Sequence, residues 1–251
     1  MLDILGKENF EAFLLARKIT ERRILEAQKS VTQFFQGKNT EQIRLETGTA
    51  IGGAVGAKGK AVILGADGQM TSGLQKIKGF EKIFEIDKYT VVSITGAVAF
   101  LQDIVKIFSA EVNFIQMQRS DGTFISPNGK ANILASLVKQ VIVLPLTYGI
   151  SMGFLLGIYD PKDDEARLFK IGPCGEIIEN KNKIAADGCG RNWVYSVLEE
   201  SYQNLGGIDI KKKDLIKLVK RAIGSAMRND TYCGPPSLFY LVDKNGARRV
   251  K

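Results

Sequence analysis

The order of strand and helix patterns constrains the fold of this 251-residue chain more than any other feature of its sequence. Two apolar runs of small residues, Thr49–Val55 and Ala61–Asp67, are separated by the stretch Gly-Ala-Lys-Gly-Lys and predict a β-hairpin. The patterns that follow predict strands, two helices, strands, two helices and a final strand. Helix pairs beside antiparallel strands indicate an α+β fold, a four-layer αββα sandwich with the helices outside and two sheets inside.

These patterns also give approximate boundaries for the remaining elements. Further strands are expected at residues 82–86, 90–95, 152–159, 166–171, 176–179 and 237–242. Helices are expected at residues 98–115, 131–143, 191–205 and 211–228.

The first 48 residues form a separable segment in this interpretation. Apolar residues recur at helical spacing between residues 8 and 36, Gly37 ends that pattern, and a polar stretch at 37–46 predicts a linker. We therefore expect a helical segment over 1–48 and one globular domain over 49–251. The N-terminus lacks the pattern of a secretory signal, because charged residues interrupt any apolar region.

Two features could point to a membrane or to nucleic acid. The stretch Gln140–Tyr159 carries no charge and is long enough to cross a bilayer, but Pro145 and the glycines after it favour a helix end, a turn and a buried strand. The net charge is +8, yet the densest basic cluster, Lys211–Arg221, shares its helical pattern with an apolar face. A solvated helix face explains that cluster, so neither partner is expected.

The chain contains no histidine, and this absence excludes Ser-His-Asp and Cys-His catalysis as well as histidine-ligated zinc. A hydroxyl nucleophile would need another base, and the free α-amine of a terminal threonine can serve because its pKa lies near about 8. Cleavage at the junction Gly48-Thr49 would produce such a threonine. Taken alone, however, this dipeptide indicates the start of a small-residue strand more strongly than it indicates a cleavage site. The three cysteines are an odd number at wide spacing, which predicts neither disulfides nor a metal site and fits a reducing cytoplasm.

Six ordered blocks give the chain a resemblance that covers Gly48 to the C-terminus. They are Gly48–Ile51, Leu64–Asp67 with Thr71 and Gly73, Lys82–Asp87, Ile94–Val98, Gly188–Gly190 with Val197–Glu199, and Asn229–Gly234. In these blocks the sequence resembles the proteasome β-subunits, most closely those of bacterial and archaeal type. The block Asn128–Asn132 is also similar to actinobacterial β-subunits, and the segment 1–48 resembles the propeptide that this family removes on maturation.

The resemblance implies a threonine endopeptidase of the N-terminal-nucleophile hydrolase fold. Processing between Gly48 and Thr49 would free Thr49, which would act as nucleophile and, through its amine, as base. Lys82 would lower the pKa of the Thr49 hydroxyl and stabilise negative charge, and Asp67 would pair with Lys82. Gly96 would offer its backbone N–H to the oxyanion.

Further positions follow from the same resemblance. Asp230 would orient the groups around the Thr49 amine, where Cys189 and Cys233 replace the usual hydroxyl residues. A thiol is a weaker hydrogen-bond donor than a hydroxyl, so these replacements would weaken the proton relay. Alternatively, both cysteines are only small buried apolar side chains with no catalytic role. Asp67 also lies two residues later than usual, which a longer hairpin could absorb. An uncharged substrate pocket is implied at Met70, Phe80, Phe84, Ile94, Val98 and Gln102, which favours cleavage after hydrophobic residues.

The resemblance also implies partners. They are a homo-oligomeric, heptameric ring of β-subunits, proteasome α-type subunits, an ATP-dependent regulatory ring and unfolded protein substrates in the cytoplasm, with no cofactor and no metal. Two alternatives remain open. One is a non-catalytic structural ring subunit, and the other is an HslV-type peptidase subunit, which Asp67-Gly68-Gln69 resembles but which is shorter than this chain.

Overall fold

The computed structural model describes residues 48–72, 75–96, 98–119, 124–141 and 151–250, together with Arg22. Apart from Arg22 and Gly48, the segment 1–48 lies outside the described residues, so its expected helix and its boundary stay predictions. Within them, no helix is long and apolar enough to cross a membrane.

Two five-stranded antiparallel sheets form the centre of the molecule. The first has the order β10-β1-β2-β11-β12 and the second has the order β5-β6-β7-β8-β9. The strands of the first sheet are β1 (Ile51–Gly56), β2 (Ala61–Ala66), β10 (Ile184–Asp187), β11 (Leu238–Asp243) and β12 (Gly246–Arg249). Those of the second are β5 (Ile83–Asp87), β6 (Thr90–Gly96), β7 (Met152–Asp160), β8 (Glu165–Ile171) and β9 (Ile177–Glu179).

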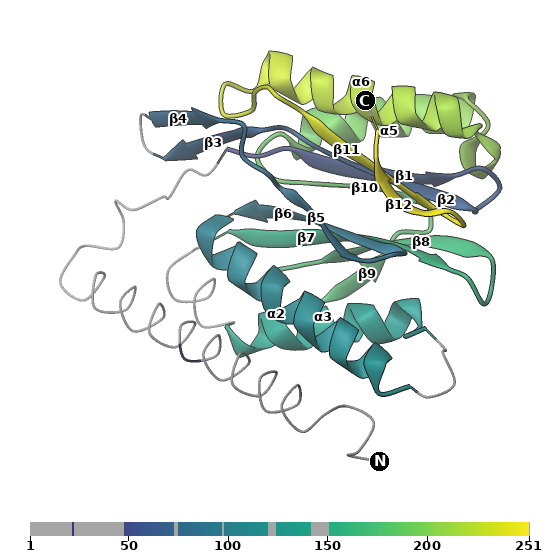
Figure 1. Cartoon of the computed structure of the whole chain (residues 1–251). Coiled ribbons are helices and arrows are strands. Elements are labelled where there is room, and N and C mark those ends of the chain that lie inside the picture. Colours follow the sequence, from purple (N-terminus) through teal and green to yellow (C-terminus); the bar gives the residue numbers. More distant parts are fainter. Residues whose placement is uncertain are drawn as a thin grey trace.

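Helices cover the outer face of each sheet, so the chain has the αββα layering that its sequence predicts (Figure 1). Helices α5 (Arg191–Asn204) and α6 (Lys212–Asn229) lie on the first sheet, and α2 (Val98–Met117) and α3 (Pro127–Gln140) lie on the second. A short 3-10 helix, η2 (Gly207–Asp209), connects α5 to α6. A separate two-stranded ribbon of β3 (Gln69–Ser72) and β4 (Gln75–Lys78) extends beside the first sheet.

The first hairpin shows why these small-residue runs form central strands. Residues alternate in direction along a strand, so Ile51 and Val55 pack between the two sheets while Ala54 packs against the outer helices. Gly52 allows a close approach, because a Cβ there would lie 2.5 Å from the Val194 side chain of α5. The turn between β1 and β2 absorbs the extra length through consecutive left-handed residues, Ala57, Lys58 and Gly59, with φ of 54°, 60° and 75°.

Some sequence boundaries were wrong. Helix α3 begins at Pro127 rather than at residue 131, because the Ser126 hydroxyl accepts a hydrogen bond from the Gly129 N–H at 3.2 Å and proline suits the first helical position. Strands β3, β4, β10 and β12, each of four residues, were not predicted.

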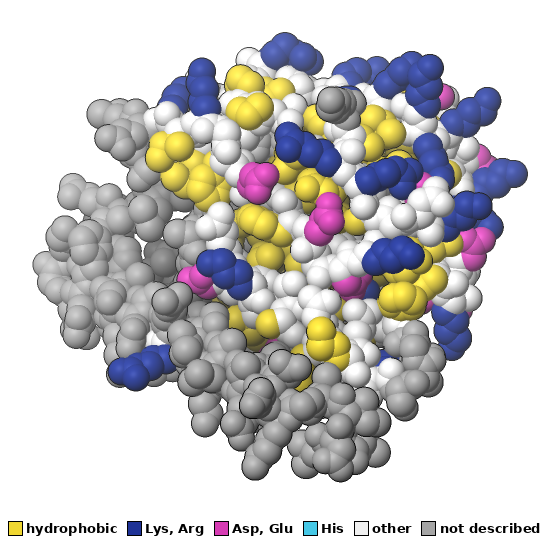
Figure 2. All heavy atoms as spheres, viewed as in Figure 1, with side chains coloured by type: hydrophobic (Ala, Val, Ile, Leu, Met, Phe, Trp, Pro, Cys, Tyr) yellow, Lys and Arg dark blue, Asp and Glu magenta, His cyan; other side chains and the backbone are white. Residues whose placement is uncertain are grey.

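The two ambiguous features have structural explanations. The uncharged stretch ends in β7, whose nine residues are all buried between neighbouring strands and layers. Along α6, Leu215, Leu218 and Val219 are buried, whereas Lys213 and Lys217 are exposed. Figure 2 shows lysine and arginine side chains scattered over the visible face, with hydrophobic and uncharged side chains between them.

Candidate active site

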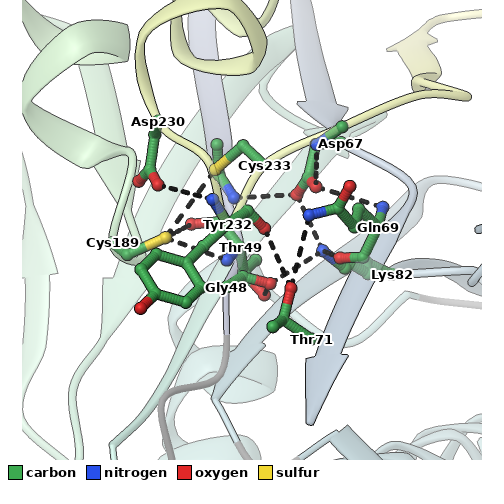
Figure 3. A network of polar contacts seen from close by, with 12 residues as sticks. Gly48, Thr49, Asp67, Gln69, Thr71, Lys82, Cys189, Asp230, Tyr232 and Cys233 are labelled. Atoms are coloured by element: carbon green, nitrogen blue, oxygen red, sulfur yellow. Dashed lines mark hydrogen bonds and ion pairs between the residues drawn. The ribbon is translucent and has the colours of Figure 1, made fainter. Parts of the chain in front are cut away.

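A buried carboxylate lies just beyond the end of β2. Asp67 is 1% exposed and accepts backbone hydrogen bonds from Ala50 at 2.8 Å, Gln69 at 3.1 Å and Gly234 at 3.1 Å. These donors come from three separate segments, so the carboxylate ties them together (Figure 3). Backbone donors also stabilise the ionised form, which a buried carboxylate needs.

The fourth donor to Asp67 is a fully buried lysine. Lys82 lies just before β5, and its Nζ contacts Asp67 Oδ1 at 2.7 Å, the Gln69 carbonyl oxygen at 2.5 Å and the Gly48 carbonyl oxygen at 3.4 Å. An ammonium group has three protons, and these three acceptors match them. The buried cation is therefore held in one position, beside the peptide bond that joins Gly48 to Thr49.

Thr49, the residue that follows this peptide bond in the chain, is completely buried. Its hydroxyl donates a hydrogen bond to the Gly48 carbonyl oxygen at 2.7 Å. The oxygen of Gly48 thus has both a hydroxyl and an ammonium beside it. The structure therefore brings together Thr49, Asp67 and Lys82, which three different segments of the first half of the chain supply.

A glycine at position 48 is needed for steric reasons. A Cβ at Gly48 would lie 2.1 Å from the carbonyl oxygen of Tyr232 and 2.3 Å from its Cβ. Contacts this short do not occur between real atoms, and the backbone of Tyr232 cannot move away as a flexible side chain would. The junction is thus packed against the segment that follows α6.

One cysteine contacts the Thr49 nitrogen, and a second cysteine contacts the first. The Thr49 N–H donates to Cys189 Sγ at 3.1 Å, and the Cys189 thiol in turn lies 3.3 Å from the Thr49 carbonyl oxygen. Cys233 Sγ is 3.7 Å from Cys189 Sγ. A hydrogen bond with Cys189, then burial, raise the pKa of the Cys233 thiol, so this thiol stays neutral near neutral pH.

Asp230 lies beside these cysteines. Its carboxylate accepts the Tyr232 N–H at 2.9 Å, and its carbonyl oxygen accepts the Cys233 N–H at 3.0 Å. The carboxylate therefore shapes the turn that carries Cys233, and no contact between it and the Thr49 nitrogen is recorded among the described residues. Asp230 would therefore orient the groups around the Thr49 amine indirectly, by holding this turn in place.

Sequence reasoning missed the role of Gln69. This side chain is 4% exposed, and its Nε2 donates to the Thr231 carbonyl oxygen at 3.2 Å and to Thr71 Oγ1 at 3.3 Å. Its backbone also contacts both charged groups, as donor to Asp67 and acceptor from Lys82. Gln69 thus links the ion pair to the segment after α6. Two signals could have found it, namely its position two residues after Asp67 and its place in a polar strand.

The end of β6 approaches Thr49 from a third direction. Gly188, with φ of 94°, lies between the Thr49 carbonyl and Thr95: a Cβ there would be 2.2 Å from Thr49 O and 2.9 Å from Thr95 Oγ1. Gly96 follows Thr95 with φ of 116°, and a Cβ at Gly96 would meet the Ser151 carbonyl oxygen at 1.9 Å. The backbone of Gly96 is therefore close to the site, and its role as oxyanion donor stays a prediction.

The predicted pocket positions lie in different environments. Ile94 is fully buried in the core under α2, and Met70, Phe80 and Phe84 are partly buried against that core. Gln102 is also partly buried, and the side chain of Val98 lies outside the described residues. Four of the six positions thus keep some exposed surface, and the substrate pocket stays a prediction.

Comparison with known proteins agrees with this arrangement. The model of the family "Proteasome subunit" matches residues 45–236. The chain belongs to the proteasome subunit family. Among its relatives is "Proteasome subunit beta" of Methanocaldococcus fervens, which is 32% identical over 189 residues, 75% of this chain and 79% of the relative. "Proteasome subunit beta" of Picrophilus torridus is 31% identical over 79% of this chain and 87% of the relative, and "Proteasome subunit beta 2" of Pyrococcus abyssi is 29% identical over 81% and 90%.

These relatives identify the chain as a proteasome β-type subunit. The family match begins three residues before Gly48 and extends past Cys233, so it spans every site residue described above. The remaining 44 residues before the match belong to the N-terminal segment, in which the sequence predicts a helix.

Proposed function

We propose that this proteasome subunit is a threonine endopeptidase that cuts its own chain between Gly48 and Thr49 and then uses Thr49 as its nucleophile. One observation carries the proposal. The carbonyl oxygen of Gly48 accepts from Thr49 Oγ1 at 2.7 Å and lies 3.4 Å from Lys82 Nζ. A nucleophile and a cation thus meet at one peptide bond, and a buried cation stabilises the negative charge that forms there far more than it would in water.

The self-cleavage step follows from these contacts. Thr49 Oγ1 attacks the carbonyl carbon of Gly48, the bond from this carbon to the Thr49 nitrogen breaks, and the hydroxyl proton passes to that nitrogen. The product is an ester between Gly48 and Thr49, and water hydrolyses it to the Gly48 carboxylate and the free hydroxyl. During attack the developing charge on the Gly48 oxygen is adjacent to the Lys82 ammonium.

Cleavage would create the base that peptide hydrolysis needs. The new α-amine of Thr49, with an ordinary pKa near about 8, can accept the hydroxyl proton as a substrate carbonyl is attacked. Gly96 would donate its N–H to the substrate oxyanion, and Asp230 would fix the turn beside the amine. Cys189 and Cys233 leave this amine with weaker hydrogen-bonding partners than hydroxyl groups.

The setting of the reaction follows from the family. Relatives named proteasome subunit β support a role for this chain in a proteasome particle. We further propose that the chain forms a heptameric β-ring, joins α-type subunits and an ATP-dependent regulatory ring in the cytoplasm, and receives unfolded proteins. The uncharged residues Met70, Phe80 and Phe84 favour large apolar side chains before the cut. A peptide library profile dominated there by acidic or basic residues would refute this preference.

Peptide hydrolysis by the assembled protein tests the proposal. The wild-type particle should cleave a fluorogenic peptide with a large apolar residue before the cut, and Thr49→Ala should not. Thr71→Ala is the matched control, because Thr71 is a second buried threonine nearby. Its hydroxyl lies 3.5 Å from the Tyr232 carbonyl oxygen, whereas the Thr49 hydroxyl contacts the Gly48 carbonyl oxygen. Equal turnover by wild type and Thr49→Ala would overturn the assignment, and inactivity of a well-assembled wild type would favour a structural ring subunit.

A further inference from the structure

Three side chains that could ligate a metal converge beside the Thr49 nitrogen. One ligand atom each from Cys189, Cys233 and Asp230 lie within 4.8 Å of one another. Cys189 follows β10, whereas Asp230 and Cys233 follow α6, so the fold brings together groups that are about 40 residues apart (Figure 3). The wide spacing that argued against a metal site in the sequence therefore does not exclude one.

The distance between the two sulfur atoms fits a bound ion better than a disulfide. In a tetrahedral zinc site with Zn–S bonds of about 2.3 Å, two sulfur ligands lie roughly 3.8 Å apart. Cys189 Sγ and Cys233 Sγ are 3.7 Å apart. A disulfide requires about 2.05 Å between them, so an ion needs less movement than a covalent bond does.

The surroundings form a site with a solvent entry path. Cys233 lies at the bottom of the site and is 4% exposed, Asp230 is partly buried, and Cys189 is exposed. Glycines on both sides of Cys189 let its backbone come this close. A Cβ at Gly190 would lie 2.9 Å from Cys233 Sγ, and one at Gly188 would collide with the Thr49 carbonyl.

We propose that Cys189, Cys233 and Asp230 bind one Zn²⁺ ion per chain beside the Thr49 nitrogen. Binding converts both thiols to thiolates and releases their protons to solvent. Two sulfur ligands and one carboxylate oxygen in a tetrahedral arrangement select zinc over magnesium or calcium, which prefer oxygen ligands. The fourth ligand is water in the uncut chain and the Thr49 amine after processing, because that nitrogen is 3.1 Å from Cys189 Sγ.

The bound ion inhibits hydrolysis, a consequence that rests on the proposed function. An amine whose lone pair binds zinc cannot accept the proton of the Thr49 hydroxyl. The subunit would therefore be inactive when zinc is available and active when zinc is removed. Metal binding itself depends on three side chains and requires no peptidase activity.

The binding test uses the full chain with Thr49→Ala, which excludes any effect of hydrolysis, in a non-thiol reductant. Titration with Co²⁺ should give one ion per chain with the visible bands of a tetrahedral ion and sulfur charge-transfer absorption, and Zn²⁺ should displace it. Cys189→Ser and Cys233→Ser should each weaken binding by at least about 100-fold, since even residues behind the ligands contribute about 10–100-fold. Cys174→Ser is the matched control and should bind normally, because Cys174 is exposed and lies elsewhere.

Other outcomes overturn the site. They are an octahedral Co²⁺ spectrum, binding that Cys189→Ser leaves unchanged, or a chain lighter by two hydrogens that binds no metal because the cysteines have formed a disulfide. Cys189 is exposed, so its variant decides the question even if Cys233→Ser does not fold.

A second measurement separates this inference from the proposed function. Zinc should abolish peptide hydrolysis by the processed particle, and a chelator should restore it. Hydrolysis that continues with zinc bound would refute the inhibition. A metal-free particle that never hydrolyses peptides would refute the proposed function and leave the zinc site intact.

Discussion

Lys82 Nζ lies 2.7 Å from Asp67 Oδ1, and both side chains are completely shielded from solvent. Moving two charges out of water costs several kcal/mol each, and hydrogen bonds must offset much of this cost. Here three backbone N–H groups satisfy Asp67, and two carbonyl oxygens satisfy the rest of Lys82. The pair thus fixes the Lys82 ammonium beside the Gly48 carbonyl oxygen, where the proposed self-cleavage needs a cation.

Replacing Lys82 by methionine should abolish processing and peptide hydrolysis. Loss of an electrostatic contact to the developing oxyanion typically costs on the order of 100-fold or more in rate. The measurement is turnover of a fluorogenic peptide together with retention of residues 1–48. Lys130→Met is the control, since Lys130 is also buried, pairs with Asp87 at 2.6 Å and donates to Thr90 at 2.7 Å outside the site. Both variants should lose about 3–5 kcal/mol of stability, but only Lys82→Met should lose activity.

Gly48→Ala should slow self-cleavage by at least about tenfold, because its Cβ would overlap the Tyr232 backbone and shift the peptide bond away from Lys82. The rate at which the precursor band disappears during assembly measures this effect. Gly224→Ala should process normally, since a Cβ there meets only the flexible end of Arg228 at 3.3 Å. Processing of Gly48→Ala at the wild-type rate would contradict the close packing at the junction.

The fold was largely predictable from local patterns. The runs that form β1, β2, β6 and β7 are buried on both faces, and such strands appear in a sequence as continuous apolar segments. The four-residue strand β10 gave no comparable signal in the sequence. Yet β10 matters for the site, since Cys189 follows it and pairing with β1 holds it beside Thr49.

The site was predictable only in part. The charged side chains of Asp67 and Lys82 are visible in the sequence, but the acceptors that fix Lys82 are backbone carbonyl oxygens, which every residue carries. The space around Gly48 depends on Tyr232, which is remote in the sequence and approaches only after folding. The resemblance placed Cys189 and Cys233 around the Thr49 amine, but their direct contact was not predicted, because it too depends on segments that are remote in the sequence.

Gln69→Ala should loosen the segment between Thr231 and Gly234. The substitution leaves the Thr231 carbonyl without this donor and should reduce stability by about 1–3 kcal/mol. Hydrogen exchange of the Gly234 N–H, which donates to Asp67, should become faster. Gln118→Ala is the control, because Gln118 is exposed and should leave both stability and exchange unchanged.

Asp243 makes stability depend on pH. A hydrogen bond from Arg248, supported by one from Lys212, lowers the pKa of Asp243 below its ordinary value. The ionised Asp243 therefore stabilises the fold fully above the unfolded-state pKa of about 3.9. This stabilisation is lost as the pH falls through the lower folded-state pKa. Asp243→Asn should therefore destabilise the protein near about pH 7 and have a smaller effect near about pH 3. Denaturant unfolding at both values measures it, and an equal effect at both would contradict the ion pairing.

The intact mass of the purified, assembled subunit tests the central claim most directly. Wild type should give a chain that starts at Thr49, whereas Thr49→Ala should keep residues 1–48, because without the hydroxyl no group attacks the Gly48 carbonyl. A wild-type chain that keeps the whole segment, or a Thr49→Ala chain trimmed at the same bond, would contradict self-cleavage by Thr49.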